Sequence, residues 1–145
     1  MPLAAVRPDL GKSLVGLAHG ATAAVEAVLA DATAKVRDRV TLDDQPVGRL
    51  LDREQRAAHG LAWLATYVEA VRQLAAYAER MTAEGLLTEM EELLVRIGIG
   101  EYLAQIQGGI PISQGEMVRP ADFGLSAAAV AAPASYADAK ADFDA

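Results

Sequence analysis

The chain has 145 residues, with 13 Lys and Arg against 20 Asp and Glu, and therefore a formal net charge of -7. Nucleic-acid affinity comes largely from clustered Lys and Arg that neutralise phosphates, so dispersed basic residues on an acidic chain predict no nucleic-acid partner. The complete lack of cysteine excludes disulfides, thiolate zinc sites and cysteine nucleophiles, and it is consistent with a reducing compartment.

The first thirteen residues contain no cationic segment that leads into an apolar run. Uninterrupted apolar stretches are also much shorter than the roughly 20 residues that a membrane span needs. We therefore expect a cytoplasmic protein of one domain that has no membrane partner.

The first predicted helix runs from about Asp9 to Val40, because apolar residues recur there at steps of three and four. Glycines near its start each lower helix stability by roughly 1 kcal/mol relative to alanine. These glycines are Gly11, Gly16 and Gly20. The pattern therefore predicts a firm helix only from about Ala21.

A second predicted helix spans about Val47 to Met81, after a turn that contains Asp43 and Asp44. Pro46 is expected in its first turn, where proline is tolerated. The predicted apolar stripe of this helix is Leu50, Leu51, Ala58, Leu61, Ala65, Val68, Val71, Leu74, Ala75 and Ala78.

A third predicted helix spans about Leu86 to Ile106, where Gly98 and Gly100 indicate close backbone approach or a kink. Its predicted apolar residues are Leu87, Met90, Leu93, Leu94, Ile97, Tyr102, Leu103 and Ile106. The fold class is therefore predicted to be all-α, an up-down bundle of three long helices. The expected division is a bundle module, 1–125, followed by an Ala-rich linker or weak helix, 126–145.

The residues from Gly108 to Ser126 end the third helix and continue as a predicted ordered, irregular segment. Glycine followed by proline stops a helix, and the apolar residues that follow are suited to anchor the segment to the bundle. Polar side chains between these anchors are available for hydrogen bonds. The predicted docking residues are Gly108, Gly109, Pro111, Gln114, Glu116, Arg119, Asp122 and Phe123.

The remaining polar residues do not form a recognisable catalytic or metal-binding motif. His19 and His59 fall on different predicted helices, outside any pattern that places two metal ligands on one helical face. Ser13 and Ser113 have no base close in sequence. We therefore assign no catalytic, cofactor-binding or metal residues to this chain. A small enzyme with a site at Gln114, Glu116, Arg119 and Asp122 remains an alternative.

Two stretches resemble a known family. The residues LLDREQRAAHGLAWLATYVEAVRQLAAYAERM, 50–81, and IGEYLAQIQGGIPISQGEMVRPADFGLS, 99–126, resemble the N-terminal helical extension of the bacterial (2S)-methylsuccinyl-CoA dehydrogenases. These enzymes are flavoproteins of the acyl-CoA dehydrogenase superfamily. The resemblance implies a role in the oxidation of (2S)-methylsuccinyl-CoA to mesaconyl-CoA, in the ethylmalonyl-CoA pathway.

The resemblance also implies that the catalytic glutamate and the FAD site lie in a dehydrogenase core beyond Ala145. The chain by itself is then not expected to be catalytic or to hold a cofactor, and its expected partner is that core, in cis or in trans. The alternative is a free-standing helical module without enzymatic activity that binds another protein or associates with itself.

Overall fold

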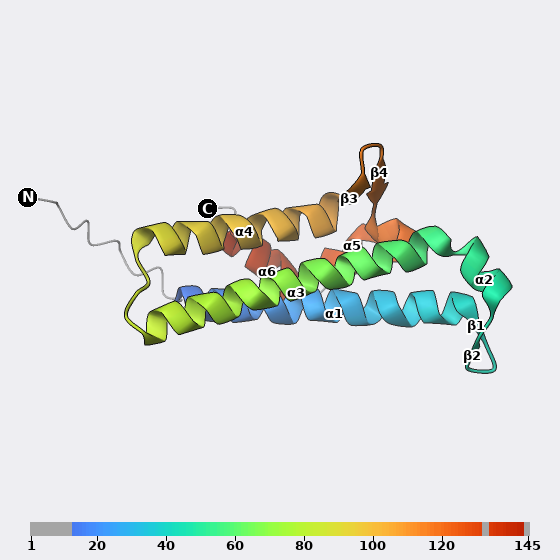
Figure 1. The fold of residues 1–145 in the computed structure, drawn as a ribbon, viewed down its shortest axis with the longest axis horizontal. Helices are drawn as coiled ribbons and strands as arrows, with labels where there is room; N and C mark the ends of the chain where they lie inside the picture. The colour runs from blue at the N-terminus through green and yellow to red at the C-terminus, as the bar shows by residue number, and fades with distance from the viewer. Residues whose placement is uncertain (1–12, 132–133, 144–145) are drawn as a thin grey trace, which may run out of the picture.

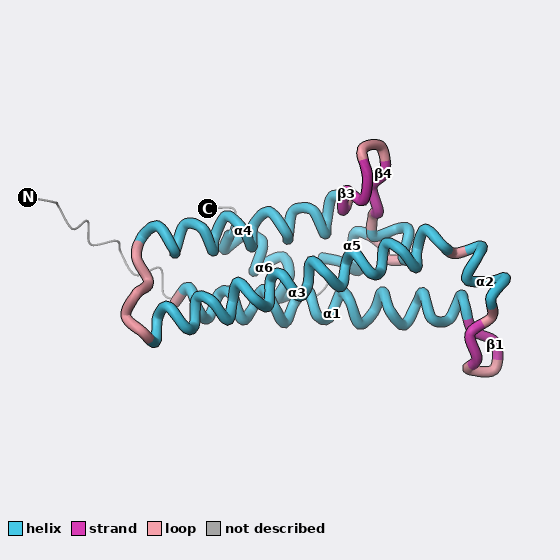
Figure 2. The backbone as a smooth tube through the Cα atoms, viewed as in Figure 1, coloured by secondary structure: helices cyan, strands magenta, loops and turns pink. Residues whose placement is uncertain are grey.

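The computed structural model describes residues 13–131 and 134–143, and it confirms the predicted all-α class. Three long helices run up, down and up: α1 (Leu14–Val40), α3 (Gln55–Ala83) and α4 (Glu89–Gly108) (Figure 1). Figure 2 shows that the strands are confined to two short hairpins outside the helices.

Helix α1 begins at Leu14, earlier than the firm start predicted near Ala21. Ser13 caps the helix, because its hydroxyl oxygen accepts a hydrogen bond of 3.1 Å from the backbone N–H of Gly16. Gly16 and Gly20 both lie inside the helix, so the prediction of a weak first turn was wrong for the described residues. The helix start predicted at Asp9 lies outside the described residues.

Helix α1 is long and apolar enough to cross a membrane by length and composition alone, which the sequence analysis did not predict. Core helices of globular proteins pass the same test, and 44% of the relevant window is buried inside the protein. Its buried residues are Leu14, Leu17, Ala18, Ala21, Thr22, Ala24, Val25, Val28, Ala32, Val36 and Val40. This stripe packs against α3, which accounts for the apolar composition of the helix.

The turn after α1 is a hairpin of β1 (Thr41–Leu42) and β2 (Gln45–Pro46). Asp43 and Asp44 have φ angles of 50° and 59°, the left-handed conformation that tight two-residue hairpins require. The predicted turn is therefore confirmed. Pro46 lies in β2 and not in the first turn of a helix, which corrects that prediction.

The second predicted helix is divided into α2 (Gly48–Arg53) and α3 by a turn at Glu54. The Glu54 carboxylate lies 3.6 Å from the guanidinium of Arg39 on α1, a contact that helical periodicity does not reveal. The side chain of Leu51 is exposed and Ala65 faces solvent, contrary to the predicted stripe, whereas Leu64 is buried. The buried residues of α3 are Ala57, Gly60, Leu64, Val68, Val71, Ala75 and Ala78.

Helix α4 begins at Glu89, three residues later than predicted, and Thr88 and Glu91 form its capping box. Hydrogen bonding from Thr88 lowers the pKa of the Glu91 carboxyl. The two internal glycines stay helical and mark close approach, as predicted. A Cβ atom at Gly98 would lie 3.0 Å from Leu74 Cδ1, and one at Gly100 would lie 3.4 Å from the backbone oxygen of Phe143.

The apolar face predicted for α4 is wrong over its first half. The core of the bundle receives Val95, Ile99, Leu103 and Ile106, whereas the large apolar residues that precede them are exposed. The exposed members of the predicted stripe are Met90, Leu93, Leu94 and Ile97. Helical periodicity locates an apolar face but does not say which of two such faces meets the core.

Aromatic side chains on α3 contribute to its contact with α4. The Tyr67 hydroxyl donates a hydrogen bond of 2.6 Å to Gln105 Oε1, and the rings of Tyr67 and Tyr102 meet edge to face at 4.9 Å. Burial, and secondarily the neighbouring Tyr102, raises the pKa of Tyr67. Both side chains are half-buried and pack against the core.

After residue 126 the described chain forms two helices, α5 (Ala127–Ala131) and α6 (Ala134–Phe143). Helix α6 packs against α1 and α4 and covers the open side between them (Figure 1). Val130 and Ala139 are buried. The Ala-rich tail is therefore helical in its described part, and the division between 1–125 and 126–145 stays a prediction.

Candidate functional site

The segment predicted to be irregular, residues 108–126, is a hairpin followed by a short 3-10 helix, and we call it the strap. Its elements are β3 (Ile110–Ser113), β4 (Glu116–Val118) and η1 (Pro120–Phe123). The strands pair antiparallel around a two-residue turn at Gln114 and Gly115. The prediction that this segment is ordered is confirmed, whereas the prediction that it is irregular is wrong. The alternating Ile110 and Ile112 followed by a Gly-containing turn was the signal that could have indicated the hairpin.

Gly109 directs the chain from α4 into the strap. Its φ angle of 137° is a conformation that favours glycine, and its N–H donates a hydrogen bond of 2.8 Å to the carbonyl of Gln105. Gly108 is still helical. The reversal buries the next residue, Ile110, which is 1% exposed and is thus the first anchor of the strap.

Val118 anchors the strap to α3 at Gly60. A Cβ atom at Gly60 would lie only 2.5 Å from Val118 Cγ1 and 2.7 Å from Cγ2, so this close approach needs glycine. Phe123 and Leu125 are also buried in the core. The strap therefore docks on the helices of its own chain.

Asp122 is the polar centre of this docking. One carboxylate oxygen accepts a hydrogen bond of 2.7 Å from the backbone N–H of Arg119, and the other accepts one of 3.2 Å from Arg56 Nε on α3. Arg56 also donates from Nη2 to the carbonyl of Met117 at 2.5 Å. Arg39 on α1 donates to the backbone carbonyl of Asp122 at 3.0 Å. The strap is thereby fixed to two helices at once.

Arg39 and Arg56 were missed by the sequence analysis, because charged residues on helix surfaces normally face solvent. Only the tertiary structure brings them to the strap. Of the predicted docking residues, Gly109, Asp122 and Phe123 contact the bundle, whereas Gly108, Pro111, Gln114, Glu116 and Arg119 are exposed.

Four consecutive exposed residues form the tip of the β3–β4 hairpin, which projects from the bundle (Figure 1). Ser113, Gln114, Gly115 and Glu116 are all exposed, and the Ser113 hydroxyl lies 3.5 Å from a carboxylate oxygen of Glu116. The four polar residues considered for a small active site are thus divided. Asp122 binds Arg56, whereas Gln114 and Glu116 lie at the tip.

Each of the two histidine side chains lies close to a polar partner on a helix of the bundle. His59 Nε2 accepts a hydrogen bond of 3.1 Å from Trp63 Nε1, and His19 lies 3.6 Å from Glu79. Among residues 13–131 and 134–143, no group of three or more His, Asp or Glu is placed to hold a metal ion.

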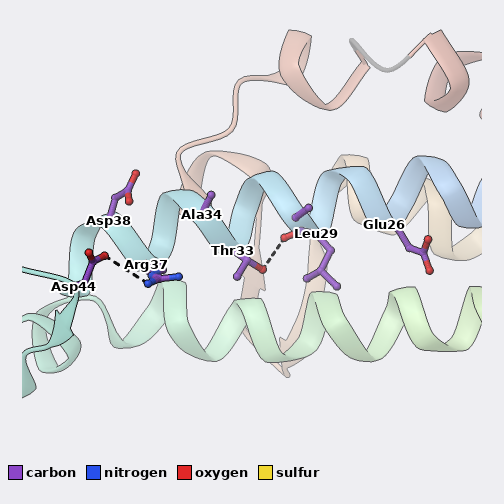
Figure 3. Close-up of a pocket in the computed structure, with 8 residues that line it drawn as sticks. Glu26, Leu29, Thr33, Ala34, Arg37, Asp38 and Asp44 are labelled. Carbon is purple, nitrogen blue, oxygen red and sulfur yellow. Dashed lines mark hydrogen bonds and ion pairs between the residues drawn. The ribbon is translucent and has the colours of Figure 1, made fainter.

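An open groove of about 800 Å³ lies along α1, away from the strap (Figure 3). Arg37 and Asp44 point toward one another across it at 3.5 Å, and the Thr33 hydroxyl donates to the backbone carbonyl of Leu29 at 2.7 Å. A second, more apolar groove of about 510 Å³ adjoins it at the first hairpin. No strap residue lines either of these two grooves.

The chain is 49% identical, over 119 residues or 82% of its length, to a segment of the (2S)-methylsuccinyl-CoA dehydrogenase of Cereibacter sphaeroides. The match covers 22% of that protein, so the chain spans about a fifth of the length of this relative. No protein-family model matches the chain. The predicted resemblance to part of this dehydrogenase is confirmed, and its N-terminal position in the enzyme stays a prediction.

Replacing Gly60 by alanine should destabilise the protein by about 1–3 kcal/mol, because the new Cβ must displace the buried Val118. Replacing Gly20 is the matched control, since a Cβ there meets nothing within 4 Å and should raise stability by about 0.5–1 kcal/mol. Urea unfolding followed by circular dichroism measures both. Equal effects of G60A and G20A would contradict the tight contact between the strap and α3.

Replacing Asp122 by alanine should lower the free energy of unfolding by about 1–2 kcal/mol, because both the cap on Arg119 and the ion pair with Arg56 are lost. Asp38→Ala removes the same charge from an exposed position of α1 and should change stability by less than about 0.5 kcal/mol. Thermal and urea unfolding give the comparison, and indistinguishable curves would count against the role of Asp122.

Proposed function

We propose that this chain is the helical extension of a flavin-dependent dehydrogenase for (2S)-methylsuccinyl-CoA, and that it docks on the catalytic core and stabilises it. The observation that carries this proposal is the 49% identity over 119 residues to part of such an enzyme. In this proposal the extension has no catalytic role, and the core oxidises the thioester to mesaconyl-CoA with FAD. The enzyme would act in the cytoplasm, in the ethylmalonyl-CoA pathway.

The state of the polar residues supports a non-catalytic role for the extension. The best-placed carboxylate, Asp122, is bound by Arg56 and by the N–H of Arg119, so its oxygens are occupied in holding the strap. Glu116 is exposed to solvent at the hairpin tip. Both carboxylates therefore fit a docking role better than that of a general base, which must be held against a bound substrate.

The hairpin tip is the part of the strap that we assign to the dehydrogenase core. Its inner end is anchored by Val118 and Asp122, so the tip is held in a defined direction away from the bundle. The tip presents an amide at Gln114 and a carboxylate at Glu116, together with the open backbone edges of a two-stranded sheet. Open strand edges pair readily with other backbone segments.

The proposal is tested by removing the matched residues from the Cereibacter enzyme and supplying this chain separately. We expect the shortened enzyme to lose thermal stability and to recover it when the 145-residue chain is added, with FAD found only on the core. The chain alone should oxidise no methylsuccinyl-CoA. Stoichiometric FAD on the isolated chain, or a shortened enzyme that the chain neither binds nor stabilises, would overturn the proposal.

The double variant Q114A/E116A should bind the shortened enzyme about tenfold more weakly, a loss of about 1.4 kcal/mol, because it removes the polar groups of the tip. The control D52A/Q55A removes one acid and one amide from exposed positions on α2 and α3. Titration calorimetry measures both affinities. Equal affinities of the two double variants would show that the tip does not contact the core.

A further inference from the structure

Two long side chains of the strap, those of Met117 and Arg119, lie over Gly109 where α4 passes into β3. A Cβ atom at Gly109 would lie 2.9 Å from Met117 Cε and 3.4 Å from Arg119 Cγ, so both side chains use the space that the glycine leaves open. Gly109 is buried, whereas Met117 and Arg119 are exposed. The two side chains therefore cover this turn from outside and are themselves open to small molecules in solvent.

The thioether of Met117 is held in a polar contact. Arg119 Nη2 donates to Met117 Sδ at 3.8 Å, and the two residues lie two apart on extended backbone, which places their side chains on one side of the chain. The backbone of Met117 is also fixed, because its carbonyl accepts from Arg56 Nη2 at 2.5 Å. A guanidinium is a strong donor and a thioether is a weak acceptor, so the donor has a poor partner here.

Oxidation by a hydroperoxide turns this weak acceptor into a strong one. A lone pair of the Met117 sulfur attacks one oxygen of hydrogen peroxide and the O–O bond breaks. The oxygen now bonded to sulfur loses its proton to the departing hydroxide, which leaves as water. Sulfur thereby loses two electrons, the peroxide gains them, and the product is methionine sulfoxide, a polar and chiral side chain.

The position of Arg119 distinguishes the two lone pairs of the sulfur. Reaction at one or the other gives sulfoxides of opposite configuration, and the guanidinium lies on one side of Sδ. On that side it donates to the peroxide oxygen as negative charge develops, and afterwards to the sulfoxide oxygen, because hydrogen bonds from a charged donor are the stronger ones. Oxidation on that side is therefore favoured.

We propose that Met117 is a modification site, at which a hydroperoxide forms one epimer of methionine sulfoxide and Arg119 holds the new oxygen by a charge-assisted hydrogen bond. The modified side chain gives the strap a polar contact in addition to that of Arg56 with Asp122. Oxidation at this position therefore tightens the hairpin where it leaves α4. The proposal does not depend on the proposed function.

Met90 on α4 provides the internal comparison. It is 63% exposed, against 38% for Met117, so exposure alone favours oxidation of Met90. Among the described residues, no donor contacts the sulfur of Met90. We therefore expect Met90 to be oxidised without preference for either epimer, since water surrounds both sides of its side chain.

The first test treats the 145-residue chain with limiting hydrogen peroxide and then digests it into peptides. Methionine sulfoxide reductases A and B each reduce one epimer, so mass spectrometry of the peptides after either enzyme gives the epimer ratio at each methionine. We expect about a tenfold excess of one epimer at Met117, which corresponds to about 1.4 kcal/mol, and nearly equal amounts at Met90. Nearly equal amounts at Met117 would overturn the proposal.

The role of Arg119 is tested by replacing it with alanine. R119A should remove the epimer excess at Met117, and it leaves the backbone N–H that binds Asp122 in place. The control R49A removes the same charge from an exposed position on α2 and should keep the excess. Circular dichroism confirms that both variants are folded. An excess that persists in R119A, or that is lost equally in R49A, would contradict the assignment.

The effect on the strap is tested in the M90L background, where Met117 is the exposed methionine of the described residues. Amide hydrogen exchange over residues 109–119 should slow about threefold after oxidation, because the strap gains a contact, and it should not slow in M90L/R119A. Unchanged or faster exchange in oxidised M90L would overturn the holding role of Arg119. None of these readouts involves FAD or a dehydrogenase core, so failure here and failure of the proposed function are distinguishable.

Discussion

The close contact between Gly60 and Val118 is the constraint on which the outer part of the structure depends. Since α3 presents no side chain at Gly60, the strap approaches its backbone and buries Val118 in the space that a Cβ would fill. The ion pair between Arg56 and Asp122 then sets the orientation of the strap, because a hydrogen-bonded ion pair is directional whereas apolar packing is not. Because the inner end is fixed, the hairpin tip projects in one defined orientation.

The bundle beneath the strap is built from small side chains. Alanine and valine dominate the buried positions of α1 and α3, so these helices meet closely and contribute many shallow contacts. Helix α4 is different, because it carries large apolar side chains on the side away from the bundle as well as toward it. The module therefore has an inner surface that completes its fold and two exposed outer features, the hairpin tip and the apolar side of α4 that carries Met90, Leu93, Leu94 and Ile97.

Most of the helical content could be predicted from the sequence, because apolar residues repeat at helical intervals and glycines follow the C-terminal ends of α3 and α4. The turn at Glu54 and the docking of the strap on the bundle could not be predicted by the same reasoning. Both involve contacts between residues distant in sequence, Glu54 with Arg39 and Asp122 with Arg56. For the strap, the sequence indicated order and named Gly109, Asp122 and Phe123, but not the two arginines that hold them.

By itself, the sequence determined the all-α class, the turn at Asp43 and Asp44 and the end of α4 at Gly109, because each of these depends on a local pattern of residues. It also determined the resemblance to part of a dehydrogenase, because that rests on runs of similar sequence. Only the tertiary structure decided which apolar side of α4 is buried. Helical periodicity is a property of one helix, whereas burial is a property of its neighbours. Val95 and Ile99 meet α3 and the rest of the core, and for that reason Met90, Leu93 and Ile97 remain outside.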